Sequence, residues 1–322
     1  MAIPIVFRNI REIAAPACAL ARNDTAFLHS KGRYTLPFFL QHENFSEGLK
    51  PEEEFATIEK MTKGGLSVNQ KADFIGVFDS GVGGISVLRQ LKKLMPNERF
   101  LYFGDSANAP YGNRTTQEVL ELTMDATEKM VAYGLKALVI ACNTATAAAI
   151  QTLRETYQDL IVIGIEPALK PAVDQFPNGT IGIMATEVTL REEKLDKLLH
   201  RYAQGASIVK IPAPGLVELI EAGKTDEAEM QQLLTELLQP YIGKLDAMVL
   251  GCTHYPLAAS ALRKVLGPRV VLLDGGEGTA RETKRRLEQE NLLFPGPGEV
   301  VWHSSAKEKE FMTLAQNLLN QR

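Results

Sequence analysis

The sequence has 322 residues, of which 45% are hydrophobic and 23% are charged. A chain of this size can bury an ordinary core and divides into about two domains, which excludes disorder over its whole length. Its 35 lysines and arginines against 39 aspartates and glutamates leave a formal charge of −4, and no basic cluster is long enough to bind nucleic acid or a membrane surface. We therefore expect a small-molecule partner.

The cysteines and the apolar runs indicate where such a protein works. Cys18, Cys142 and Cys252 are odd in number and form no C-x-x-C pair, which suits a reducing cytosol. Every apolar run is far shorter than the ~20 residues of a membrane helix. Charged side chains at positions 8–12 interrupt the region where a secretory signal would be continuous and apolar. The sequence thus predicts a cytoplasmic protein.

Residues 1–72 form an extension of uncertain order. They carry clustered charges at "KPEEEF" and a "KGG" break, and they show no clear alternation of strand and helix patterns. Met61 lies a dozen residues before the first predicted strand and is a plausible start of translation.

From residue 73 onward, short β-branched runs alternate with stretches of helical periodicity, as at 116–134 and 226–243. This pattern is typical of parallel strands covered by helices, so the predicted fold class is α/β with several βαβ units. The expected strands are 74–79, 99–105, 137–142, 160–165, 180–185, 207–212, 247–251 and 270–274.

An internal repeat divides this region into two similar parts. A shift of 110 positions lays Cys142 on Cys252 together with the apolar run before it, and a shift of 106 lays "IGVFDS" on "IGIMAT". Each cysteine then lies just beyond the carboxyl end of a buried strand, where open α/β sheets bind ligands.

The stretch "VFDSGVGGISVLRQL" at 77–91 predicts a strand, a glycine-rich turn and a helix. Backbone N–H groups of such a turn suit an anion such as a carboxylate. The glycines do not match G-x-G-x-x-G, so a dinucleotide site is not indicated. Asp79 could take part in the site or simply cap the helix.

Two thiols in matching positions suggest a specific chemistry. A stereocentre with an acidic C–H is inverted when a base removes the proton from one face and an acid returns one to the other. A thiol ionises near pH 8.5, and a helix N-terminus or positive charge lowers that value, so one cysteine could be thiolate and the other thiol. Each cysteine is followed by polar residues and then a helical stretch, so we expect each to lie at a helix N-terminus. The alternatives are two structural cysteines and a zinc site on Cys252 and His254, for which further ligands are not obvious.

Four motifs in order, "VFDSGVGG", "DSANAPYG", "ACNTA" and "GCTHYPL", resemble the glutamate racemase family of the aspartate/glutamate racemase superfamily. The resemblance implies two pseudo-symmetric α/β domains with mainly parallel sheets and an active site in the cleft between them. The implied boundaries are 73–165 with 276–322 for the first domain and 166–275 for the second. The implied activity is cofactor-independent interconversion of L- and D-glutamate, with the D-form supplying peptidoglycan synthesis.

The resemblance also assigns roles to residues. Cys142 is expected to act on the D-enantiomer and Cys252 on the L-enantiomer. The supporting catalytic residues are Asp79 beside Cys142, His254 beside Cys252, and the further matches Asp105 and Glu221. The substrate-binding residues would be Asp79, Ser80, Tyr111, Gly112, Asn143, Thr144, Thr253, His254, Thr186 and Thr189, a set of donors that needs no metal.

Some of these residues have simpler interpretations. Glu221 lies in a predicted amphipathic helix and could be a solvated surface residue. An Asx-turn would explain Asp105 equally well. Trp302 and the closing helical stretch are interpreted as packing. The family further implies a homodimer and possible regulation by a cell-wall precursor, but residues 1–72 contain no motif for that regulation.

Other functions stay open on the sequence. A sister isomerase acting on aspartate or another amino acid would differ only in its pocket. A lyase of the same superfamily would need one of the two cysteines, and a binding protein would need neither. Spacing does not exclude pyridoxal phosphate, but paired thiols remove the need for it.

Overall fold

In the computed structural model, residues 73–320 are described, apart from 192, 204 and 226. They belong to one compact unit of the chain. The extension 1–72, with Cys18 and Met61, lies outside the described residues. None of the described helices is both long and apolar enough to cross a bilayer.

The first sheet is parallel throughout and has the strand order β4-β3-β1-β2-β9. Its strands are β1 (Phe74–Asp79), β2 (Arg99–Gly104), β3 (Leu135–Ile140), β4 (Ile161–Gly164) and β9 (Glu299–Ser304). The central strand β1 is buried on both faces, which is why its sequence is a continuous apolar run.

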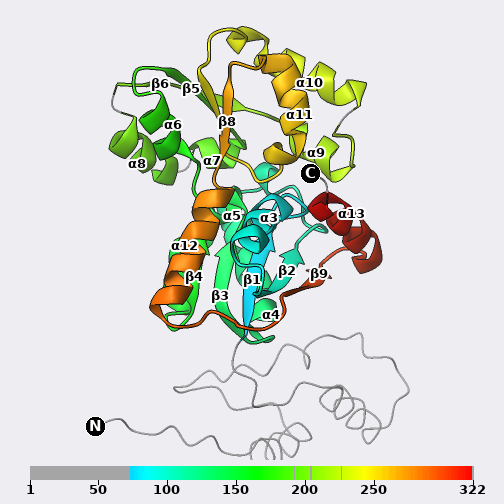
Figure 1. The fold of residues 1–322 in the computed structure, drawn as a ribbon. Coiled ribbons are helices and arrows are strands. Elements are labelled where there is room, and N and C mark those ends of the chain that lie inside the picture. The colour runs from blue at the N-terminus through cyan, green and yellow to red at the C-terminus, as the bar shows by residue number, and fades with distance from the viewer. Residues whose placement is uncertain (1–72, 192, 204, 226, 321–322) are drawn as a thin grey trace, which may run out of the picture. The chain divides into compact units, whose positions relative to one another are not determined.

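Helices cover both faces of this sheet (Figure 1). Ile75 and Val77 of β1 point to the core shared with α3 (Ile85–Leu94), α12 (Gly276–Gln289) and α13 (Glu308–Asn320). The alternate residues Phe74 and Phe78 point to the core shared with α4 (Thr116–Val131) and α5 (Asn143–Thr156). The first sheet with these helices is called the first half below.

The second sheet is also parallel, with the order β6-β5-β7-β8. Its strands are β5 (Thr180–Ala185), β6 (Ser207–Pro212), β7 (Ala247–Leu250) and β8 (Val271–Asp274). One face packs on α9 (Leu216–Glu221), α10 (Ala228–Leu238) and α11 (Ala259–Leu266), and the other on α6 (Leu169–Gln175) and α8 (Glu193–Tyr202). The shorter elements are η2 (Tyr111–Asn113), α7 (Glu187–Arg191), η3 (Gln239–Tyr241) and η4 (Tyr255–Ala258). These strands and helices form the second half.

The chain enters the second half after β4 and returns after β8, because α12 packs on α3 of the first half. The two crossings touch: a Cβ atom at Gly275 would collide with the carbonyl oxygen of Glu166. The domain boundaries at 165/166 and 275/276 stay a prediction of the sequence.

The predicted α/β class with two pseudo-symmetric parts is confirmed, and the eight predicted strands are present within two residues at each end. Strand β9 is not predicted by the sequence pattern, and its residue Trp302 is interpreted there only as packing. This edge strand is partly exposed, and its partner β2 lies about 200 residues earlier in the chain. The local sequence pattern therefore does not predict that β9 pairs with β2.

Candidate active site

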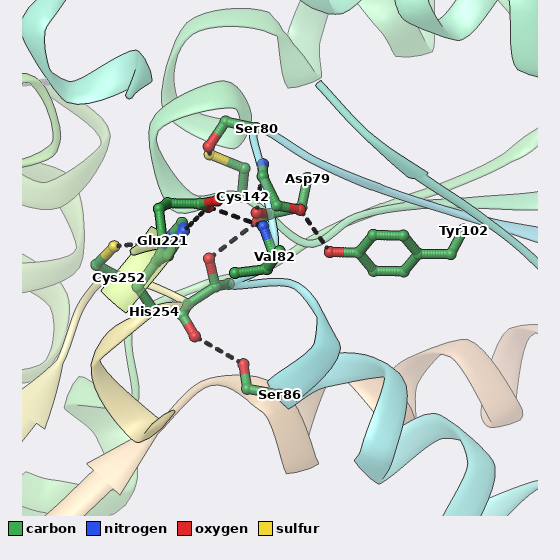
Figure 2. Close-up of polar contacts among 11 residues, drawn as sticks. Asp79, Ser80, Val82, Ser86, Tyr102, Cys142, Glu221, Cys252 and His254 are labelled. Carbon is green, nitrogen blue, oxygen red and sulfur yellow. Dashed lines mark hydrogen bonds and ion pairs between the residues drawn. The ribbon is translucent and has the colours of Figure 1, made fainter. Parts of the chain in front are cut away.

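The loops at the carboxyl ends of β1 and β3 meet the corresponding loops of β5 and β7. Thr253, after β7, donates from Oγ1 to Oδ2 of Asp79 at the end of β1 over 2.9 Å. Thr144, at the start of α5, lies 3.1 Å from the hydroxyl of Thr186, which follows β5. Ser86 of α3 donates from Oγ to the carbonyl oxygen of Thr253 over 2.9 Å. The two halves are therefore joined by direct hydrogen bonds around both cysteines (Figure 2).

Cys142 lies two residues beyond β3 and is the N-cap of α5. Its Sγ accepts a hydrogen bond from the N–H of Ala145 at 3.4 Å and lies 3.6 Å from Oγ of Ser80. The side chain is buried, and burial raises the pKa of Cys142 to about 12, with the negative charge of Asp79 adding to the rise. The two hydrogen bonds oppose this rise but do not cancel it. Cys142 is accordingly a protonated thiol at neutral pH.

Cys252 occupies the equivalent place beyond β7 but has a different neighbour. Its Sγ lies 3.7 Å from Nδ1 of His254, whose Nε2 lies 2.6 Å from Oε1 of Glu221. Because Glu221 accepts at Nε2, the imidazole presents Nδ1 to the sulfur. Burial by itself lowers the pKa of His254, but the hydrogen bonds and charges of Cys252 and Glu221 outweigh it and raise the pKa well above its usual value.

The sequence predicts a helix N-terminus behind each cysteine, and this is correct only for Cys142. Cys252 is followed by the four-residue 3-10 helix η4, whose N-cap is His254, and α11 begins only at Ala259. The proline at position 256 lacks an N–H donor, so a regular α-helix cannot begin as early as it does after Cys142. Cys252 therefore depends on an imidazole where Cys142 has a helix N-terminus.

Asp79 is fully buried and is not a helix cap. Its Oδ1 accepts from the N–H of Gly81 at 3.0 Å and its Oδ2 accepts from Thr253, whereas the N-cap of α3 is Gly84. Burial raises the pKa of Asp79, although the charge of His254 and the hydrogen bonds work against the rise. The charge of Asp79 thus acts on Cys142, and its carboxylate binds Thr253, the residue that follows Cys252.

Glu221, the last residue of α9, points into the site and is not a solvated surface residue. Its side chain is 21% exposed, and the same oxygen that meets His254 accepts the N–H of Val82 at 2.8 Å. The sequence predicts N–H donors in this glycine-rich turn, but it does not indicate that Glu221 is the carboxylate they hold. A carboxylate of the second half is therefore held by the first half.

Asp105 lies in the loop after β2 and acts on Tyr111. Oδ2 of Asp105 accepts from the phenol of Tyr111 at 2.6 Å, and Asn108 donates to both carboxylate oxygens. Burial, followed by the charge of Asp105, raises the pKa of Tyr111 well above its usual value, so the phenol stays a donor. Among the hydrogen bonds of the described residues, none joins Asp105 to either cysteine.

The remaining predicted substrate residues lie close together. Thr186 and Thr189 share a hydrogen bond of 3.1 Å, and Thr144 contacts both hydroxyls. Gly112 approaches Thr186 so closely that a Cβ atom would lie 2.8 Å from its Cγ2. Asn143, next to Cys142, is buried, and its Oδ1 accepts no hydrogen bond from the part of the chain that the structure describes. An acceptor of this kind suits an ammonium group.

A cavity of about 570 Å³ opens beside this cluster and is lined by residues of both halves, including Gly112, Thr186 and Val217. Neither cysteine is among the residues that line it, and both cysteine side chains are buried. Within the described ranges, no three histidine, cysteine, aspartate or glutamate side chains are arranged to hold a metal ion.

Comparison with known proteins gives four further findings. The model of the Asp/Glu/Hydantoin racemase family matches residues 75–283. A relative from Clostridium perfringens named glutamate racemase is 44% identical over 248 residues, covering 76% of this chain and 95% of its own. The crystal structure of a glutamate racemase isoform from Bacillus anthracis is similar with a TM-score of 0.70 and 31% identity, over 79% of this chain and 96% of that one.

A glutamate racemase from Escherichia coli, solved with L-glutamate and the activator UDP-MurNAc-Ala, is similar with a TM-score of 0.68 and 31% identity, over 76% of this chain and 94% of that one.

Proposed function

Because the chain belongs to the Asp/Glu/hydantoin racemase family, we propose that it interconverts L- and D-glutamate by passing the α-proton between Cys142 and Cys252. The class of enzyme, an amino-acid racemase, follows from the family and from relatives named glutamate racemase. Glutamate as substrate is supported by those names and by the L-glutamate in the Escherichia coli structure. D-Glutamate made in this way would supply peptidoglycan synthesis in the cytoplasm.

The observation that carries the proposal is the difference between the two thiols. Cys142 is held as a thiol, with a pKa of about 12, whereas Cys252 stands 3.7 Å from an imidazole whose pKa is raised. His254 therefore gives Cys252 a partner for proton transfer that Cys142 lacks. We assign Cys252 the role of base toward L-glutamate and Cys142 the role of acid, the two roles that a two-base inversion requires.

With L-glutamate bound, the Cys252 thiolate takes the α-proton and becomes a thiol, and the electron pair of the broken C–H bond remains on the planar carbanion. The Cys142 thiol then gives its proton to the opposite face and becomes a thiolate. The product is D-glutamate, and the reverse reaction begins from the Cys142 thiolate. Charge on the α-carboxylate in the transition state is stabilised by fixed donors that need no reorganisation.

Those donors come from the substrate-binding residues expected from the sequence. Hydroxyls of Ser80, Thr144, Thr186 and Thr189, with backbone N–H groups at Gly112 and Thr253, would hold the two carboxylates. Oδ1 of Asn143 would accept from the ammonium group. Because both thiols are buried and neither lines the cavity, substrate entry requires contacts between the halves, such as that of Thr253 with Asp79, to open.

The first test incubates purified protein, without added cofactor, with L-glutamate in heavy water. Two opposed bases predict loss of optical rotation, with early deuterium mainly in D-glutamate and little in the remaining L-glutamate. A response to L- or D-aspartate instead would indicate a sister isomerase. Release of carbon dioxide without racemisation would indicate a lyase. Binding of glutamate without any exchange would indicate a binding protein and contradict the proposal.

We also propose regulation by a cell-wall precursor and a homodimeric state. The activator UDP-MurNAc-Ala in the Escherichia coli structure supports the first, and the family resemblance suggests the second. We expect the rate of racemisation to rise on addition of UDP-MurNAc-Ala. We also expect analytical ultracentrifugation to give the molecular mass of a dimer.

A further inference from the structure

Tyr102 is a fully buried tyrosine of β2 whose hydroxyl faces the site. The phenol donates to the carbonyl oxygen of Gly81 at 2.9 Å. Burial, followed by the charges of Asp79 and Glu221, raises the pKa of Tyr102 well above its usual value, so this hydroxyl stays a donor over the working pH range. The proposed proton transfer does not use it.

The carbonyl that accepts from Tyr102 belongs to the same peptide unit as the N–H of Val82. That N–H donates to Oε1 of Glu221 at 2.8 Å, and the same oxygen lies 2.6 Å from Nε2 of His254. A peptide unit is planar, so a bond that fixes its oxygen also fixes the direction of its N–H. Donation to the oxygen also polarises the amide and strengthens the N–H as a donor.

We propose that Tyr102 is a positioning residue: acting through the single peptide unit between Gly81 and Val82, it holds the carboxylate of Glu221 and thereby sets His254 against Cys252. Figure 2 shows these groups in sequence, from the phenol of Tyr102 to the sulfur of Cys252. The importance of this series of contacts for catalysis rests on the proposed racemase function. The geometry of the contacts is independent of that proposal.

The ring of Tyr102 is itself fixed by the carboxy-terminal part of the chain. It packs on Trp302 of β9, with ring centroids 5.4 Å apart, and on Phe311 of α13, with centroids 6.0 Å apart. A Cβ atom at Gly84 would lie 2.9 Å from the phenol oxygen, so the glycine leaves room for this hydroxyl. Residues 299–320 therefore support the Cys252 side of the site although they contribute no group to it in the proposed mechanism.

A double-mutant cycle tests the proposal. Tyr102→Phe keeps the ring and removes the donor, and we expect kcat/KM to fall about tenfold, mainly through kcat. In a Glu221→Gln background the same substitution should cost less than about twofold, because the carboxylate that it positions is absent. A full additional loss in the Gln background would show that Tyr102 acts on the fold alone and would overturn the proposal.

A second readout does not depend on turnover. The imidazole of His254 is titrated by NMR in the parent protein and in Tyr102→Phe, and its signal is assigned by its loss in His254→Asn. The titratable groups that face this ring are Cys252 on its own loop, Glu221 on α9 and Asp79 at the end of β1. If the contact of Glu221 with His254 weakens in Tyr102→Phe, the pKa of His254 should fall. An unchanged pKa would contradict the proposal.

The matched control is Tyr157→Phe, which removes a phenol hydroxyl at the end of α5, outside the site, and should change neither readout. If Tyr102→Phe does not fold, Phe311→Leu replaces it, since it loosens the ring and keeps the hydroxyl; a lower pKa of His254 is again expected. A parent protein without racemase activity but with the shifted titration would reject the proposed function and keep this inference. Racemisation by the parent protein, with no effect of Tyr102→Phe on either readout, would keep the proposed function and reject this inference.

Discussion

The surroundings of Cys142 and of Cys252 differ more than their sequences suggest. Each cysteine lies two residues beyond a buried parallel strand. Cys142 caps an α-helix, touches a hydroxyl and lies near the charge of Asp79, and burial keeps it protonated. Cys252 has no such helix and is paired with His254 and Glu221. The repeated backbone thus provides equivalent positions, and the side chains around the two thiols give them different hydrogen-bond partners.

The largest effect is expected when either cysteine is removed. Cys142→Ala and Cys252→Ala should each lower racemisation by about 10²- to 10⁴-fold, because proton transfer on one face is lost. Heavy water distinguishes the two cysteine variants. Cys142→Ala should still exchange the α-proton of L-glutamate only, and Cys252→Ala should exchange that of D-glutamate only. Proton NMR of each enantiomer measures this exchange.

Cys18→Ala, outside the described residues, is the control for these variants. Exchange of both enantiomers by a single-cysteine variant would contradict the assignment of one thiol to each face.

Glu221→Gln should have the next largest effect and should act through His254. Loss of the carboxylate removes a hydrogen bond to a charged group, and kcat/KM should fall about 10- to 100-fold. Because Glu221 helps to raise the pKa of His254, the substitution should lower that pKa, and the limb of the pH–rate profile that reports loss of the imidazolium should move to lower pH. Glu229→Gln, at an exposed ion pair with Lys224, should leave the profile in place.

Asp79→Asn should change Cys142 in a defined direction. Burial is the main cause that raises the pKa of this thiol, and the negative charge of Asp79 adds to the rise. Removal of that charge should lower the pKa and increase the thiolate fraction at every pH below it. Alkylation of Cys142 by iodoacetamide, followed by peptide mass spectrometry between pH 7 and 10, should be faster in Asp79→Asn than in the parent. Slower or equal alkylation would show that Asp79 does not act on Cys142 electrostatically.

Ser80→Ala should have the smallest effect and the opposite sign. The hydroxyl of Ser80 lies 3.6 Å from Sγ of Cys142 and helps to lower the pKa of the thiol. Its removal should raise that pKa and slow alkylation of Cys142 about two- to fivefold, the effect of one hydrogen bond. Cys252, which lies beside His254, should be alkylated at the parent rate, and equal slowing of both thiols would indicate a general loss of access.

The sequence by itself determined the α/β class, eight of the nine strands within the described residues, and the equivalent positions of the two cysteines. These features depend on local periodicity and on motifs, which need no knowledge of distant contacts. The tertiary structure decided the partners. It placed Glu221 on His254, Asp79 on Thr253 and the phenol of Tyr102 on Gly81, across separations of 33, 174 and 21 residues. Such contacts join residues that are distant in the sequence, so the different surroundings of the two thiols became visible only in the folded chain.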